Sequence, residues 1–154
     1  SFRLREIARL TKISPPSVMN YLKEFEKEGL IKKQIKREIP FYSAIRDNSN
    51  FVMYKKINIF FELNHVGLVD YLWDELSPEA IVLYGSFSRG ESIENSDIDL
   101  FILGKYRKLD LSDFEERLNK KIHLMFKESL KETPNELKNN ILNGIVLKGY
   151  TKVY

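Results

Sequence analysis

Residues 81–103 decide the fold of this chain, and they read Ile-Val-Leu-Tyr-Gly-Ser-Phe-Ser-Arg-Gly-Glu-Ser-Ile-Glu-Asn-Ser-Asp-Ile-Asp-Leu-Phe-Ile-Leu. The opening apolar run, residues 81–84, predicts a buried strand. Gly85 and Ser86 then end that strand in a tight turn. After ten further residues, Asp97 and Asp99 stand at the head of a second apolar run, which predicts a strand over residues 98–103. The stretch is therefore expected to form two strands with two carboxylates at the start of the second.

The two aspartates are expected to lie on one face, because side chains alternate across a strand. Paired carboxylates at the end of a buried strand repel each other and are costly to desolvate. A divalent cation would relieve that repulsion and would also attract phosphates. Gly85 lets a backbone approach a ligand closely. Ser86 is expected to start a short helix whose free N–H groups point at an anion. The alternative is an ordinary Gly-Ser turn followed by two solvated aspartates.

A family resemblance rests on the same residues. The run Gly85-Ser86-Phe87-Ser88-Arg89-Gly90, followed by Ser96-Asp97-Ile98-Asp99-Leu100, resembles the signature of the nucleotidyltransferase superfamily related to DNA polymerase beta. It looks like the small, stand-alone prokaryotic branch of that superfamily, over roughly residues 65–154. The resemblance implies transfer of a nucleoside monophosphate from ATP or another nucleoside triphosphate to a hydroxyl group. It also implies Mg²⁺, or Mn²⁺, held by Asp97 and Asp99.

Several residues of the motif are candidates for contact with the nucleotide. They are Gly85, Ser86, Ser88, Arg89 and Ser96. Arg89 has a second expected role, because it could pair with Glu91 instead of touching a phosphate.

His123 marks the main departure from the family. The superfamily usually places a third catalytic acid on a later strand, in an apolar-Asp-apolar pattern. Here residues 121–126 predict that strand, and His123 stands at the matching position. An unperturbed imidazole pKa near 6.5 suits a general base, and imidazole is also a ligand for softer metals. The third interpretation is that the catalytic role is lost and the domain only binds nucleotide.

Charge divides the chain into two parts. Residues 1–46 hold 11 Lys and Arg against 5 Asp and Glu, a net +6, whereas residues 47–154 hold 14 against 17, a net −3. A basic first third suggests a module that binds nucleic acid.

The chain contains no cysteine, so disulfides and thiolate metal sites are excluded. No membrane-length apolar run and no secretory signal is visible, so we expect a cytoplasmic protein.

The basic part predicts two helices and a hairpin. Apolar spacing predicts a helix over residues 3–10, and a second helix over residues 15–28 is expected to begin at the N-cap Ser14 and to end at Gly29. Residues 30–42 read as two short strands joined by a basic turn. Two helices followed by such a hairpin predict a winged helix-turn-helix. The run from Ser14 to Ile31 resembles the recognition helix of archaeal and bacterial winged-helix regulators. The first helix of those regulators has no counterpart after Ser1, so we expect upstream residues or another element to cover the core.

Double-stranded DNA is the expected partner of this module. On the second helix, Ser17, Asn20 and Lys23 lie off the apolar face and could reach bases or phosphates. On the wing, the backbone-binding candidates are Lys32, Lys33, Lys36 and Arg37. The alternative is a protein-docking or dimerisation module whose charges are only solvated.

The chain is therefore predicted to have an α/β (α+β) architecture in three segments. These are a winged helix-turn-helix over 1–46, a helical linker over 47–66 and a small mixed-sheet nucleotidyltransferase domain with flanking helices over 67–154. Residues 51–63 predict a strongly apolar helix, which favours packing on both modules or on a second copy in a homodimer.

Two functions remain open at this stage. One is the Mg²⁺-dependent transfer of AMP from ATP to a hydroxyl group of a protein or an RNA. Small proteins of this branch resemble the antitoxins of toxin–antitoxin pairs, which implies a toxin protein as partner. The other is a DNA-binding transcriptional regulator whose nucleotidyltransferase-like domain is inactive and senses nucleotide or docks a protein.

Overall fold

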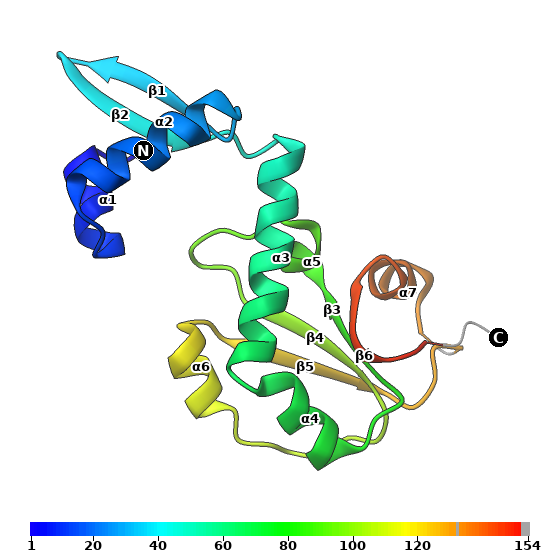
Figure 1. Ribbon diagram of the computed structural model, residues 1–154. Coiled ribbons are helices and arrows are strands. Elements are labelled where there is room, and N and C mark those ends of the chain that lie inside the picture. Colours follow the sequence, from blue (N-terminus) through cyan, green and yellow to red (C-terminus); the bar gives the residue numbers. More distant parts are fainter. Residues whose placement is uncertain (132, 152–154) are drawn as a thin grey trace. The chain divides into compact units, whose positions relative to one another are not determined.

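The computed structural model describes residues 1–131 and 133–151, and it has a mixed α/β architecture (Figure 1). The chain divides into two compact units, Ser1–Met53 and Tyr54–Tyr154. The boundary lies within helix α3 (Ser49–His65), inside the range that the sequence assigns to a helical linker. Each unit has its own hydrophobic core, so each is described separately.

The first unit is a winged helix-turn-helix, as predicted. Its elements are α1 (Leu4–Thr11), α2 (Pro15–Lys27), β1 (Ile31–Lys36) and β2 (Ile39–Ala44), with β1 and β2 antiparallel. The hydroxyl of Ser14 accepts a hydrogen bond from the backbone N–H of Ser17 at 3.4 Å and so caps α2. Positive φ angles of 49° at Arg37 and 64° at Glu38 turn the hairpin, as a two-residue hairpin loop requires.

A small core holds the first unit together. It is formed by Ala8 of α1, Val18 and Leu22 of α2, and Tyr42 of β2. An apolar hollow of about 300 Å³ opens beside it, lined by Ile7, Thr11, Ile13, Val18, Tyr21, Leu22 and Phe25. Part of this core is therefore open to solvent in the described structure.

The second unit is built on one four-stranded sheet. After α3 its elements are α4 (Leu68–Leu76), β3 (Ala80–Tyr84), α5 (Gly85–Arg89), β4 (Ile98–Leu103), α6 (Ser112–Leu118), β5 (Ile122–Lys127), α7 (Asn135–Leu142) and β6 (Ile145–Gly149). The strand order is β5-β4-β3-β6, with β4 and β5 parallel and the other two pairs antiparallel. The predicted mixed sheet with flanking helices is confirmed.

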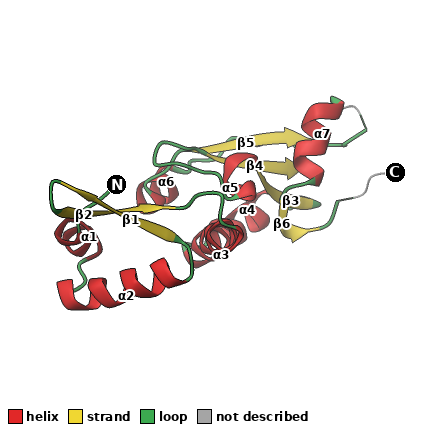
Figure 2. Cartoon of the chain, turned by 90° about the horizontal axis from the view of Figure 1, so that it is seen from above, coloured by secondary structure: helices red, strands yellow, loops and turns green. Residues whose placement is uncertain are grey.

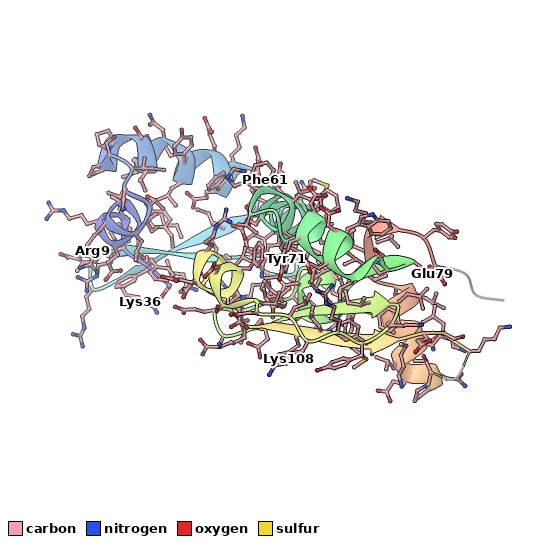
Figure 3. All side chains as sticks on the ribbon, turned by 90° about the horizontal axis from the view of Figure 1, so that it is seen from below. Arg9, Lys36, Phe61, Tyr71, Glu79 and Lys108 are labelled. Atoms are coloured by element: carbon pink, nitrogen blue, oxygen red, sulfur yellow. The ribbon has the colours of Figure 1, made fainter. Side chains whose placement is uncertain are left out.

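Helices cover both faces of this sheet (Figures 1 and 2). On one face, side chains of α3, α4 and α6 pack on the even-numbered residues of β4, such as Leu100. Figure 3 labels Tyr71 of α4, whose ring lies 5.1 Å from the ring of Phe114 of α6. On the other face, Ile141 of α7 packs on the odd-numbered residues Phe101 and Leu103. Because β4 alternates, Asp99 belongs to the α7 face of the sheet.

Helix α3 combines a tight cap with an exposed apolar stripe. The side chain of Asn48 accepts a hydrogen bond from the N–H of Phe51 at 3.0 Å and so caps the start of the helix. The exposed apolar residues of α3 are Met53, Tyr54, Ile57, Phe60 and Phe61, the last of which is labelled in Figure 3. The expected homodimer stays a prediction. Among the helices of the described residues, none is long and apolar enough to cross a membrane.

Candidate functional site

Three side chains form a row across the sheet at the start of β4. Tyr84 at the end of β3 pairs with Asp99 of β4, and Asp99 pairs with His123 of β5. Residues paired in register across neighbouring strands present their side chains on the same face. Strand pairing therefore brings together the aspartate and the histidine that the sequence singled out from segments more than twenty residues apart.

His123 lies between the two aspartates. Its Nε2 atom is 3.8 Å from Oδ2 of Asp97, and its Nδ1 atom is 3.6 Å from Oδ1 of Asp99. The side chains of His123, Asp97 and Asp99 are 62%, 44% and 31% exposed. The cluster is thus open to solvent at one side, where a ligand can reach it.

The surroundings of the Asp99 carboxyl group disfavour its charged form. Burial raises its pKa, and the nearby charge of Asp97 raises that pKa further, while His123 lowers it. The pKa of the Tyr84 phenol is also raised, first by burial and then by Asp99. Both shifts show that negative charge is unfavourable at this end of β4 in the absence of a cation.

The missing side chain of Gly85 makes room for Asp99. Gly85 has a φ of +73°, and a Cβ atom placed there would lie 2.6 Å from Oδ2 of Asp99. The sequence predicted that this glycine lets a backbone approach a ligand. The structure shows that it lets the β3–α5 turn approach the carboxylate of Asp99. The approach of a ligand stays a prediction.

The other motif residues have internal partners. Helix α5 begins at Gly85, one residue before the predicted start at Ser86. The buried hydroxyl of Ser88 donates to the carbonyl of Gly85 at 2.9 Å. The exposed Arg89 pairs with Glu91 at 2.7 Å, which is the second of its two expected roles. The hydroxyl of Ser96 accepts from the N–H of Ile93 at 2.8 Å. Nucleotide contacts at Ser86, Ser88, Arg89 and Ser96 stay predictions.

The geometry favours a metal ion bound by the two carboxylates over one bound by three protein ligands. Among residues 1–131 and 133–151, no group of three or more His, Cys, Asp or Glu side chains could hold a metal ion. His123 therefore does not complete such a site in this arrangement. Mg²⁺, however, is commonly bound by one or two carboxylates together with waters and substrate phosphates. Asp97 and Asp99 fit that mode of binding, and their mutual repulsion favours it.

Tyr84 lies in the candidate site beside Asp99, and the sequence did not single it out. Its hydroxyl lies 4.0 Å from Sδ of Met125 on β5, so the ring extends across β4 beside Asp99. A signal was present, because the last residue of β3 must neighbour the Gly85 turn. What the sequence alone could not supply was the pairing of Tyr84 with Asp99.

The pKa of Asp99 makes a prediction about stability. Because the folded-state pKa is raised, the carboxylate destabilises the fold above that pKa, and the cost disappears as the pH falls to the unfolded value near 3.9. In EDTA, Asp99→Asn should therefore raise the melting temperature at pH 7 by a few degrees and change it little at pH 3.5. Asp74→Asn, at an exposed position of α4, is the matched control. A lower melting temperature for Asp99→Asn at pH 7 would contradict the assignment.

The candidate DNA-binding residues lie on the surface of the first unit. Asn20 and Lys23 of α2 are exposed, whereas Ser17 is half-buried and its hydroxyl is 2.9 Å from that of Ser14. On the wing, the exposed cations are Lys32, Lys33, Lys36 and Arg37. Lys36, labelled in Figure 3, places its Nζ 5.6 Å from the centre of the Phe41 ring. The roles of all these residues on DNA stay predictions.

Comparison with known families agrees with both units. Residues 67–152 match the family described as polymerase beta, nucleotidyltransferase, and residues 4–32 match the family described as winged helix-turn-helix DNA-binding. The first match covers more than half of the chain. The site at the start of β4 is thus that of a nucleotidyltransferase-type domain. The chain belongs to the polymerase beta nucleotidyltransferase family and carries an N-terminal winged helix-turn-helix DNA-binding domain.

One solved structure provides a further comparison. It is described as the crystal structure of the toxin-antitoxin with AMP-PNP, and its aligned chain is 25% identical to this one. The alignment covers 53% of this chain and 71% of that chain, with a TM-score of 0.40. Among curated proteins, none matches the chain.

The wing makes a prediction about DNA binding. Removing one lysine that binds a phosphate should reduce the slope of log K against log salt concentration by about 0.9. Lys32→Ala and Lys33→Ala together should therefore lower affinity for a mixed-sequence duplex and reduce that slope by about 2. Fluorescence anisotropy across a salt series measures both quantities. Lys105→Ala, in the second unit, should leave the affinity and the slope unchanged. An unchanged slope in the double variant would show that Lys32 and Lys33 do not contact DNA.

Proposed function

We propose that the second unit is a Mg²⁺- or Mn²⁺-dependent nucleotidyltransferase that transfers AMP from ATP to a hydroxyl group of a protein or RNA. The observation that carries the proposal is the pair formed by Asp97, just before β4, and Asp99, on β4, which lie 3.8 Å and 3.6 Å from His123, with the Gly85 turn close to Asp99. The raised pKa of Asp99 supports it, because a cation would stabilise the charged form.

The residues of the site divide the chemistry between them. When bound, the cation would neutralise charge on the triphosphate and on the leaving pyrophosphate. Asp97 and Asp99 would hold it, and Ser86 in the first turn of α5 would offer its backbone N–H to a phosphate. His123 would accept the proton of the acceptor hydroxyl. The oxygen of that hydroxyl then bonds to the α-phosphorus, and the bond to the β-phosphate breaks to release pyrophosphate.

Labelled ATP tests this proposal directly. The protein is incubated with Mg²⁺ and ATP labelled at the α-phosphate, with cell extract as the source of acceptors. Label should appear on a macromolecule, and treatment with protease or ribonuclease then identifies the acceptor as protein or RNA. Absence of transfer by the wild type, at ATP concentrations that saturate binding, would reject the activity.

The acceptor is proposed to be a partner protein. The motif Gly85 to Leu100 resembles small antitoxins, some of which adenylylate their cognate toxin. An antitoxin that also binds DNA could act on its own promoter through the winged helix. Protease-sensitive label would support this assignment, and ribonuclease-sensitive label would replace it with an RNA acceptor.

A second candidate function follows from His123. This residue stands where the family places a third acid, and within the described residues His123 and the two aspartates do not make a three-ligand metal site. The chain would then be a DNA-binding regulator whose second unit binds nucleotide, or docks a protein, without catalysis. ATP binding without label transfer would favour this function.

His123→Ala tests whether the histidine is a general base or has no catalytic role. A general base contributes about 10²–10⁴-fold to a rate. The variant should therefore lower kcat for label transfer by about 100-fold while the dissociation constant for ATP stays close to that of the wild type. His65→Ala, at the end of α3, is the control. A kcat unchanged by His123→Ala would show that the proton leaves by another route.

A further inference from the structure

The loop that carries Asp97 is held in place by groups outside it. Residues 90–97 connect α5 to β4 and contain no helix or strand. Two hydrogen bonds shape the loop from within: Ile93 N–H to the hydroxyl of Ser96 at 2.8 Å, and Ser96 N–H to the carbonyl of Ile93 at 3.0 Å. A third joins the loop to α5, from Glu91 N–H to the carbonyl of Ser86 at 2.9 Å. None of these bonds connects the loop to α3 or to the turn before β5.

Two lysines provide that connection. Nζ of Lys55, on α3, donates to the carbonyl of Ser92. Nζ of Lys120, in the turn between α6 and β5, donates to the carbonyl of Glu94 at 2.5 Å. Both lysines are half-buried; Ser92 is buried, whereas Glu94 is exposed, so the loop is held once at a buried position and once at an exposed one. Because the two lysines bind backbone carbonyls, they hold the backbone of the loop itself and not only a side chain.

The same turn also holds the residue after Asp97. The N–H of Ile98 donates to the carbonyl of Lys121 at 2.8 Å. The segment 120–121 therefore bonds to the chain on both sides of Asp97, at Glu94 and at Ile98. That arrangement leaves Asp97 little freedom to move away from Asp99 and His123.

We propose that Lys55 and Lys120 are positioning residues for Asp97. They hold residues 92–94 so that the carboxylate of Asp97 stays beside that of Asp99 and the two can bind one cation. This inference rests on the proposed function, since it assigns Asp97 the role of a metal ligand. Groups that orient a metal ligand typically contribute about 10–100-fold to metal affinity.

The test combines two measurements on the full chain. Lys55→Met and Lys120→Met, alone and together, are compared with Lys56→Met, a half-buried neighbour on α3. In metal-free protein, amide hydrogen exchange of residues 91–97 should accelerate at least about tenfold in the double variant, while the amides of β3 and β4 stay protected. Electron paramagnetic resonance should then show Mn²⁺ bound about 10-fold or more weakly. Lys56→Met should change neither quantity. Lys55→Arg should keep both the exchange rates and the Mn²⁺ affinity closer to the wild type than Lys55→Met does.

Each outcome decides a separate claim. Unchanged exchange in residues 91–97 would overturn the proposal, because the lysines would not hold the loop. Faster exchange with unchanged Mn²⁺ affinity would overturn it too, because the position of Asp97 would not depend on them. If the wild type bound no Mn²⁺, the proposed function would fail, while the exchange data would still decide whether the lysines order the loop.

Discussion

Replacing Asp97 or Asp99 by asparagine is expected to lower the rate of nucleotide transfer by about 100-fold or more. A bound metal ion contributes several kcal/mol of charge stabilisation to a transition state, and each factor of ten in rate corresponds to about 1.36 kcal/mol. Asparagine has nearly the shape of aspartate but lacks its charge, so the carboxylate pair at the start of β4 would lose half of its negative charge. The row that places Asp99 between Tyr84 and His123 should survive the change.

Control measurements make this loss specific to the site. Transfer from α-labelled ATP gives the rate, and Mn²⁺ titration gives the metal affinity. The rate and the affinity should fall together in these variants. Asp74→Asn removes an exposed carboxylate from α4 and should change neither. Transfer that persists at the wild-type rate in both Asp97→Asn and Asp99→Asn would show that the reaction takes place elsewhere on the chain.

The fold followed closely from local patterns in the sequence. The apolar run at residues 98–103 predicts a strand with the bounds that β4 has in the structure. Ser14 and Pro15 predict where α2 begins, because capping chemistry is local. These features depend on residues within one or two turns of each other, which is the range that sequence patterns describe.

The site followed from the sequence only in part, because its geometry depends on strand pairing. The sequence identified Asp97 and Asp99 as a pair and His123 as the residue at the position of the third acid, but the parallel pairing of β4 with β5 is what puts His123 beside both carboxylates. Tyr84 was missed for the same reason, since its antiparallel pairing with Asp99 is a long-range feature. The lysine contacts to residues 92 and 94 also join segments far apart in the chain.

Gly85→Ala is the second change with a large expected effect. A Cβ at residue 85 would lie 2.6 Å from Oδ2 of Asp99, a distance at which one of the two groups must shift. The flexible group is the carboxylate, so Asp99 should move away from its place beside His123. The φ of +73° adds a backbone cost of about 1–2 kcal/mol for a residue with a side chain. Metal affinity and transfer should both fall by about tenfold or more, with a moderate loss of stability.

Gly67→Ala separates these two effects. Gly67 has a φ of +80°, yet no atom lies within 4 Å of the Cβ that alanine would add. The variant should therefore lose the same amount of stability, about 1–2 kcal/mol, which chemical denaturation measures, and keep its Mn²⁺ affinity. If both variants lose stability and only Gly85→Ala loses Mn²⁺, the clash with Asp99 is the cause. Equal Mn²⁺ affinity in the two variants would mean that Asp99 can bind the ion from a shifted position, and that Gly85 serves the turn alone.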